Sequence, residues 1–540
     1  MSSSLATNLR ETVRARSQFQ LVIPLLALIS TIAIGQVTTR VNLDSAGDEA
    51  NGYTAGCSVS ADGRFVAFPS VAGNLVANDT NGTTDTFVHD RKTGETVRVS
   101  VDSQGHEGDS WSGLPSISAD GRLVAFISAA TNLVPDAGWG NGHTQVFVHD
   151  RATQRTWQLS VASFEQSFEK GGNADSLYPF ISANGQGVAF MSAASNLVPG
   201  DTNGTFDVFF HDLNTGLTRR ASVDSSGDQG NSSSSGPSLS ADGRYVCFDS
   251  HASNLVPGDT NGSTDVFVHD CETGTTLRVN VASDGSQAND ESYRSSISAD
   301  GRLVAFGSDA TNLVSDDTNP WMDIFVHDLQ TQETTRASLN SKGRQANSYS
   351  FDPQLSADGR FVTFVSDASN LSGGDTNGYN DIFVRDRLEG KTRRASVDSD
   401  GNQANNWSWL PEISADGRFK AFSSVASNLA ANDNNGEMDV FVRGPQHTLE
   451  AEPAEVTGGE QLTLTTYKGV PDNGASLFIV AVNGTSTFQF VSLGDFAADG
   501  LYIVSGIVPG IGPVEITFRG YALGRNGEIN PTNDLLVVFK

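Results

Sequence analysis

A seven-residue pattern of oxygen-bearing side chains, Asp-Thr-Asn-Gly-x-x-Asp, recurs along the chain and could hold a hard cation. Calcium takes six to eight oxygen ligands, and side chains at positions one, three and seven supply part of that shell. The pattern lacks the acidic fifth position and the distal Glu of an EF-hand. The same residues also form turns in which Asp and Asn bond their own backbone. The candidate ligands for Ca2+, which is the one candidate cofactor, are Asp79, Asn81, Asp85, Asp201, Asn203, Asp207, Asp259, Asn261, Asp265, Asp375, Asn377, Asp381, Asp433, Asn435 and Asp439.

Two copies of this pattern are altered. One keeps Asp317, Asn319 and Asp323 but has Pro320 in place of glycine, and the copy that begins at Asp136 has lost the pattern.

Aromatic residues gather beside these loops. Aromatic rings next to Asn and Asp suit recognition of a sugar or a peptide. The alternative is that the rings pack between repeat units or fill the centre of the fold. The candidate ligand-binding residues are Trp111, Trp139, Tyr178, Tyr293, Trp321, Tyr349, Trp407 and Trp409, and Phe351 lies among them.

Catalytic residues find little support. Five histidines occupy one repeated position, where two further units carry Arg385 and Arg443. Histidines on different units cannot converge on one metal, so we interpret them as structural, and a position that accepts Arg is expected to face solvent at a strand end. No serine-hydrolase elbow, zinc-protease motif or phosphate loop occurs in a fitting context, although an acid pair stays open. The five histidines are His89, His149, His211, His269 and His327.

The elements that position these residues come from an internal repeat. Five of the six intervals between copies of its Ser-Ala-Asp-Gly-Arg motif are 58 residues, and the sixth is 64 because six residues are added between 164 and 171. Each unit contains four alternating segments separated by turn signals, as in 237–240, 244–250, 265–270 and 275–282. Four antiparallel strands in such a unit describe a propeller blade. The motif begins at Ser60, Ser118, Ser240, Ser298, Ser356 and Ser414, with a worn copy at Ser182.

The two ends of the repeat array predict that the propeller is closed. The seventh unit stops after its third strand, Asp439 to Arg443, and the segment from Thr38 to Gly52 matches the missing fourth strand and its loop. Closure in this way leaves no free sheet edge. The sequence therefore predicts an all-β fold, a seven-bladed β-propeller closed by an N-terminal strand. Its Asp-Asn-Asp loops and aromatics share one face, and the opposite face carries tight turns.

The repeat also resembles a known family. The strings "SADGRFVAFxS" and "DxFVHD" resemble the TolB-type, WD-repeat-like propeller units that read "SPDGKxIAFxS" and "IYVMD", and the resemblance covers residues 37–444. It implies a TolB-like propeller fold. TolB itself has six blades behind an N-terminal α/β domain, whereas this chain shows seven units and an extra C-terminal domain, so the role of TolB is not transferred.

Composition and the chain ends give the remaining expectations. Residues 1–35 read as a signal peptide whose apolar run is too short to span a bilayer, so we expect export to the periplasm or cell surface and no transmembrane span in the mature protein. The propeller spans 36–445, and 446–540 contains about six short strands typical of an immunoglobulin-like β-sandwich. A net charge of −29 disfavours nucleic acid as a partner.

Three cysteines cannot form a full disulfide framework. Cys247 and Cys271 could pair, whereas buried free thiols, with Cys57 among them, are the alternative that we favour.

These observations favour a non-enzymatic, exported binding or scaffold protein. We expect a monomer that uses its loop-rich face to bind an unknown protein, peptide or glycan. Two alternatives stay open: a glycan-active hydrolase or lyase, and a cell-surface structural protein stiffened by calcium.

Overall fold

The computed structural model describes residues 36–134, 142–162 and 171–445, together with the backbone of four strands between 477 and 519. Residues 36–445 form one compact unit. The described residues contain no helix with the length and apolar composition needed to cross a membrane. The predicted signal peptide and Trp139 lie outside the described residues.

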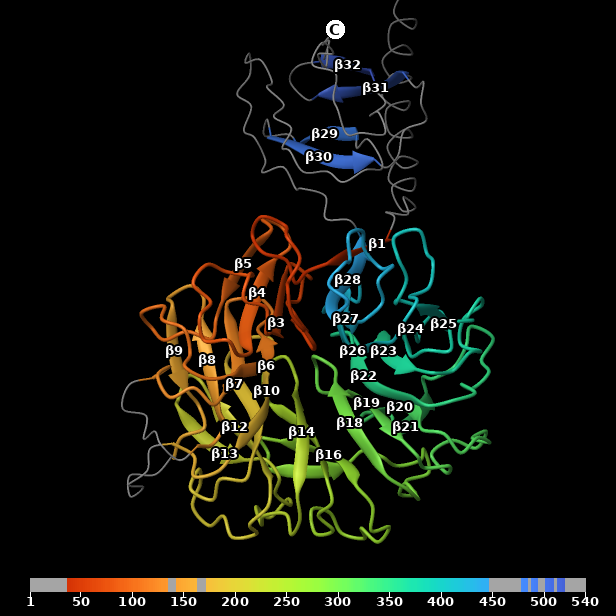
Figure 1. Ribbon diagram of the computed structural model, residues 1–540. Helices are drawn as coiled ribbons and strands as arrows, with labels where there is room; N and C mark the ends of the chain where they lie inside the picture. Colours follow the sequence, from red (N-terminus) through yellow and green to blue (C-terminus); the bar gives the residue numbers. More distant parts are fainter. Residues whose placement is uncertain are drawn as a thin grey trace, which may run out of the picture. The chain divides into compact units, whose positions relative to one another are not determined.

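Seven four-stranded antiparallel sheets make up residues 36–445 and follow one another around a common axis (Figure 1). The innermost strands, which contact one another, are β2 (Ser58–Val59), β6 (Ser112–Ile117), β10 (Ser176–Ile181), β14 (Ser234–Leu239), β18 (Ser292–Ile297), β22 (Ser350–Leu355) and β26 (Ser408–Ile413). The second strands are β3 (Phe65–Ser70), β7 (Leu123–Ser128), β11 (Gly187–Ser192), β15 (Tyr245–Ser250), β19 (Leu303–Ser308), β23 (Phe361–Ser366) and β27 (Lys420–Ser424). The third strands are β4 (Asp85–Asp90), β8 (Gln145–Asp150), β12 (Asp207–Asp212), β16 (Asp265–Asp270), β20 (Asp323–Asp328), β24 (Asp381–Asp386) and β28 (Asp439–Pro445). The outermost strands are β5 (Glu95–Arg98), β9 (Arg155–Gln158), β13 (Leu217–Arg220), β17 (Thr275–Arg278), β21 (Glu333–Arg336), β25 (Lys391–Arg394) and β1 (Gln36–Arg40).

The predicted all-β propeller of seven blades is confirmed, and so is its closure. Strand β1 pairs antiparallel with β28, with Arg40 opposite Phe441, and so supplies the fourth strand of the last blade (Figure 1). The first and last segments of the propeller are therefore held in one sheet.

Phenylalanines fill the space between neighbouring sheets. One from each second strand and one from each third strand stack within a blade, as Phe68 and Phe87 do with centroids 6.0 Å apart. Both are fully buried among apolar residues of the adjoining blade. The strands are apolar on both faces because each sheet is covered on both sides.

The Ser-Ala-Asp-Gly-Arg turns lie on what we call the turn face, opposite the loop face that carries the Asp-Asn-Asp loops. In the first blade Asp62 accepts the N–H of Arg64 over 2.9 Å, and the guanidinium of Arg64 donates two bonds to Asp90, of 2.9 and 2.6 Å. Gly63 has φ of +72°, and a Cβ there would lie 2.3 Å from the ring of Phe419 in the preceding blade. The motif needs glycine for both reasons.

The same turns join the blades into a ring. The Ala of one turn donates its N–H to the carbonyl of the Ala in the next turn, as Ala61 does to Ala119 over 3.0 Å. In the worn copy Asn184 replaces Ala183 as the donor, and the last link runs from Ala415 to Ala61 over 3.1 Å. The repeated motif thus connects neighbouring blades as well as turning the chain.

The C-terminal part is described only by two antiparallel pairs of strands, β29 (Leu477–Asn483) with β30 (Thr487–Leu493), and β31 (Leu501–Val508) with β32 (Gly512–Arg519). Two further strands expected at 461–466 and 534–539 lie outside the described residues. The immunoglobulin-like sandwich stays a prediction.

Candidate functional site

Each intact Asp-Asn-Asp loop surrounds an arginine of its own blade. In the first blade Nη1 of Arg98, at the end of β5, lies 3.0 Å from Oδ2 of Asp85 and 3.5 Å from Oδ1 of Asp79. The chain itself therefore supplies a positive charge to these two buried carboxylates. The equivalent arginines are Arg220, Arg278, Arg336, Arg394 and, from the N-terminal strand, Arg40.

The asparagine of each loop shapes the turn. Oδ1 of Asn81 accepts the N–H of Thr83 over 3.0 Å, and its Nδ2 donates to Asp85 over 2.9 Å and to the carbonyl of Gly108 over 3.0 Å. This is the geometry of an Asx turn, and it ties the loop to the connection that follows the outermost strand.

The second blade shows that the acid and the arginine belong together. Gln145 and Gln158 stand where the first blade has Asp85 and Arg98, and Nε2 of Gln158 donates to Oε1 of Gln145 over 3.2 Å. Nε2 of Gln145 donates to the carbonyl of Gly172 over 3.1 Å, as Asn81 does to its own partner. Both charges are lost in the same blade, which indicates that the arginine is there to balance the carboxylates.

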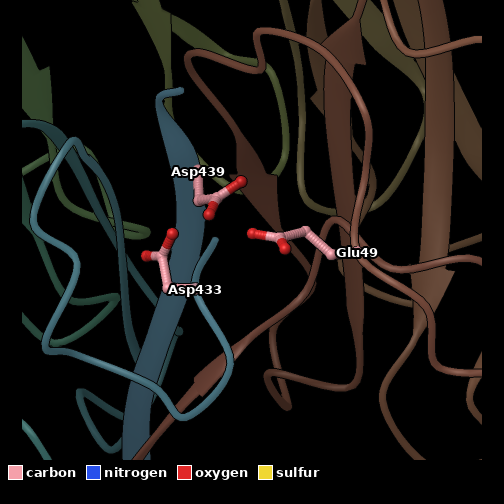
Figure 2. Close-up of side chains that lie close together, drawn as sticks. All are labelled: Glu49, Asp433 and Asp439. Atoms are coloured by element: carbon pink, nitrogen blue, oxygen red, sulfur yellow. The ribbon is translucent and has the colours of Figure 1, made fainter. Parts of the chain in front are cut away.

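Two blades carry a third carboxylate at these loops, from Glu107 in the first blade and Glu49 in the last. Glu49 points toward Asp433 and Asp439 across the closure of the ring (Figure 2), and Arg40 contacts all three. Burial, followed by the charge of Asp439, raises the pKa of Asp433 to about 6. In each of these two blades three carboxylate oxygens lie within 4.8 Å of one another. Calcium binding at the loops stays a prediction.

The repeated histidines are structural, but the expectation that they face solvent is wrong. His149 is 1% exposed, and its Nδ1 lies 2.9 Å from Oγ1 of Thr156 on the neighbouring strand. Burial lowers the pKa of this imidazole to about 4, so it is neutral at pH 7. Arg385 fits the same place because its guanidinium donates to the carbonyls of Leu339 and Asn340 in the preceding blade.

The aromatic residues predicted from the sequence divide into two groups. Trp409 and Phe351 are half-buried and pack against the apolar core between the last two blades. Tyr293 is also half-buried. The rings of Trp111, Tyr178, Trp321, Tyr349 and Trp407 are exposed.

Four exposed aromatics stand on four successive blades, and we call them the aromatic arc: Tyr349, Trp407, Tyr53 and Trp111. They are 42, 45, 48 and 38% exposed and stand at one repeat position. Tyr349, Trp407 and Trp111 directly precede the innermost strand, whereas the innermost strand of the first blade begins only at Ser58, further along from Tyr53. The other three blades carry Asp175, Ser233 and Glu291 at this position. The seven positions are equivalent in the structure, because the backbone carbonyl of each residue accepts the N–H of the first residue after the second strand of its blade.

Two members of the arc are braced by rings from the Asp-Asn-Asp loop of the preceding blade. Trp321 meets Tyr349 edge-on with centroids 4.8 Å apart, and Tyr379 meets Trp407 edge-on at 5.4 Å. The ring centroid of Trp409 lies 5.6 Å from that of Trp407. These contacts fix the exposed rings in place, and Tyr53 and Tyr379 are residues that the sequence reasoning did not include.

Three residues further along, each innermost strand carries a residue with positive φ. These seven residues, which we call the channel ring, are Gly56, Leu114, Tyr178, Gly236, Arg294, Asp352 and Leu410. In six of the strands the register shifts at this point, so the ring residue sits in a β-bulge. Five of the seven are not glycine, although φ values near +50° cost such residues roughly 1–2 kcal/mol. Strain of this kind gathers at functional sites.

Charged members of the ring lie together. Arg294 pairs with Asp352 of the next blade, and its backbone N–H donates to Oδ2 of Asp249 over 2.9 Å. Asp249 is 5% exposed, its Oδ1 has no hydrogen-bond partner, and burial raises its pKa to about 7. The other second strands have Pro, Ile, Met, Gly, Val or Ser at this position, so only a comparison of the repeats column by column would have found Asp249 in the sequence.

The three cysteines are free thiols, two of them buried and Cys271 half-buried. The pairing of Cys247 with Cys271 is therefore not present.

No protein-family model matches this chain, and no curated protein does. Among solved structures, TolB from Acinetobacter baumannii is 16% identical, with 63% of this chain and 62% of that chain covered and a TM-score of 0.34. This chain therefore spans less than two thirds of the TolB chain. An oligogalacturonate lyase from Vibrio parahaemolyticus is 12% identical over 73% of this chain and 90% of its own, with a TM-score of 0.43.

An acylaminoacyl peptidase from Pyrococcus horikoshii is 12% identical over 69% of this chain and 49% of its own, with a TM-score of 0.40. The sheets described above define the fold of residues 36–445, which is a β-propeller with seven blades.

Proposed function

We propose that this protein is a binding protein whose ligand lies across the loop face, on the aromatic arc and over the channel ring. One observation carries the proposal. At a position that the repeat holds in identical main-chain geometry, four successive blades expose a large aromatic ring while three carry polar residues. The fold does not require those rings, since Ser233 serves in their place, and exposed aromatic side chains gathered on neighbouring blades are typical of an interaction site.

Variants that carry the serine found at this position in the fourth blade test the proposal. Replacing Tyr349 and Trp407 with serine, the residue at position 233, should weaken ligand binding at least tenfold, because exposed aromatics supply most of the contact area. The melting temperature should fall by less than ~2 °C, since both rings are largely outside the core. The matched control is Ser233→Ala, which changes the same position on the fourth blade, outside the aromatic arc. Equal binding by the double variant would contradict the proposal.

Catalysis by a glycan-active hydrolase or lyase stays the alternative. Its one structural support is Asp249, whose pKa of about 7 suits proton transfer near neutral pH. Turnover of any glycan, lost in Asp249→Asn, would favour this alternative over binding alone.

Calcium binding at the loops also stays a proposal. An ion at the Asp79, Asp85 and Glu107 cluster would share its carboxylates with Arg98, which limits the affinity that we expect. A higher melting temperature in ~10 mM calcium would support the proposal, and an unchanged one would contradict it.

Export and the monomeric state are also expected from the sequence. Fractionation of producing cells tests export, and the molecular mass in solution tests the monomeric state.

A further inference from the structure

The loop face has two unlike regions. The aromatic arc lies on blades that also carry Leu114 and Leu410 in the channel ring, and both leucines are exposed, at 40 and 42%. Leucine is kept there at φ of +47° and +53°, in a position where Gly56 and Gly236 avoid the strain. An exposed leucine offers no hydrogen bond to a sugar hydroxyl but contacts an apolar side chain well.

The blade that adjoins Tyr349 at one end of the arc is acidic. Glu291 stands at the arc position of the fifth blade, and its carbonyl accepts the N–H of Asp309 over 3.0 Å. None of the ion pairs among the described residues includes Glu291 or Asp309. Burial, and then the charges of Asp309 and Glu291, raise the pKa of the intervening Tyr293.

The one cation close to them in the channel ring, Arg294, is already neutralised by Asp352. Behind it, Oδ1 of Asp249 is buried without a partner. The overall charge of −29 adds a negative field around this corner. Glu291 and Asp309 therefore have no cation paired with them among the described residues. The exposed parts of the arc rings remain accessible to apolar side chains of a ligand.

We propose, resting on the binding function above, that the ligand is a polypeptide segment with both apolar and basic side chains. Its apolar side chains contact the aromatic arc and the two leucines, and a Lys or Arg lies against Glu291 and Asp309. This arrangement follows from charge complementarity on one side and apolar area on the other. A neutral glycan would use the rings and could donate hydroxyl hydrogen bonds to the carboxylates, but it would leave the leucines without an apolar partner and the two negative charges without a cation.

The experiment compares three probes on the intact chain: a labelled ten-residue peptide that alternates Leu and Lys, the same peptide with Glu for Lys, and cellohexaose. The Leu/Lys peptide should bind at least tenfold more tightly than the Leu/Glu peptide, and its affinity should fall at least tenfold between 50 and 500 mM NaCl. Glu291→Gln with Asp309→Asn should weaken binding about tenfold. The control, Glu333→Gln, removes one charge from the turn face of the same blade and should have no effect.

The outcomes separate this inference from the function on which it rests. Binding of cellohexaose, or of both peptides equally, that is lost in the Tyr349→Ser/Trp407→Ser variant keeps the binding function and overturns the polypeptide inference. Binding of any probe that survives that variant overturns both. Melting curves for each variant show that a loss of binding is not a loss of folding.

Discussion

The arginine inside each Asp-Asn-Asp loop should be essential for stability only as long as the carboxylates are present. In the third blade Arg220 lies 3.3 Å from both Asp201 and Asp207, and the side chains of all three are less than a tenth exposed. Replacing Arg220 with glutamine leaves two buried carboxylates without their cation, which costs about 3–5 kcal/mol.

The size of the effect on melting follows from the size of the propeller. Unfolding entropy of about 2.1 cal/mol/K per residue, over the 410 residues from 36 to 445, is about 0.9 kcal/mol/K. A loss of about 3–5 kcal/mol should therefore lower the melting temperature by about 4–6 °C. Adding Asp201→Asn and Asp207→Gln reproduces the uncharged arrangement of the second blade and should recover most of that loss.

Differential scanning calorimetry at pH 7 measures both variants against Arg219→Gln, which removes an exposed arginine next to the site and should change melting by less than ~1 °C. The melting temperature of the single variant should also recover as the pH is lowered. Burial raises the pKa of Asp207, so the folded state gains stability as the pH falls and this carboxyl takes up a proton. The reasoning is refuted if Arg220→Gln costs no more than Arg219→Gln, or if the triple variant melts as low as the single one.

Three further predictions concern titration and strain. The pKa of His149 is lowered from 6.5 to about 4, so the stability that this neutral imidazole contributes is complete above pH 6.5 and is lost as the pH falls toward 4. The variant His149→Arg places in this blade the residue that two other blades carry. Between pH 7 and 4.5 it should lose about 2–3 kcal/mol less unfolding free energy than the unmodified protein, as measured by denaturant titration. For Asp249 the pH dependence of stability is reversed, because its raised pKa makes the folded state take up a proton as the pH falls. The variant Asp249→Asn keeps an acceptor for the N–H of Arg294. It should raise the free energy of unfolding by up to about 4 kcal/mol at pH 7.5, and the difference should vanish near pH 4. Leu410→Gly should relieve positive-φ strain and raise stability by about 1 kcal/mol while weakening peptide binding, and a variant that loses stability would contradict the assignment of strain.

The internal repeat allowed the number of blades and the closure of the propeller to be predicted from the sequence. The spacing of Ser-Ala-Asp-Gly-Arg counts the blades, and the match between Thr38–Gly52 and the fourth-strand segments identifies the closing strand, because each blade is a local unit with its own turns and alternation. The second and third strands of the fourth blade lie within one residue of the prediction. The innermost strand begins earlier, at Ser234, and the outermost strand ends at Arg278 rather than continuing to 282.

The tertiary structure decided everything that depends on contacts between blades. The sequence places Asp79 and Arg98 in one unit, but only the folded sheet shows that the guanidinium lies between the carboxylates. It also shows that the repeated histidines are buried, because an outer strand and the preceding blade cover them. The channel ring needs positive φ at bulges of the innermost strands, and the aromatic arc needs Tyr53 of the first blade beside Trp407 of the last. Each bulge forms within one blade, but only the closed ring brings the innermost strands together and places the first blade next to the last.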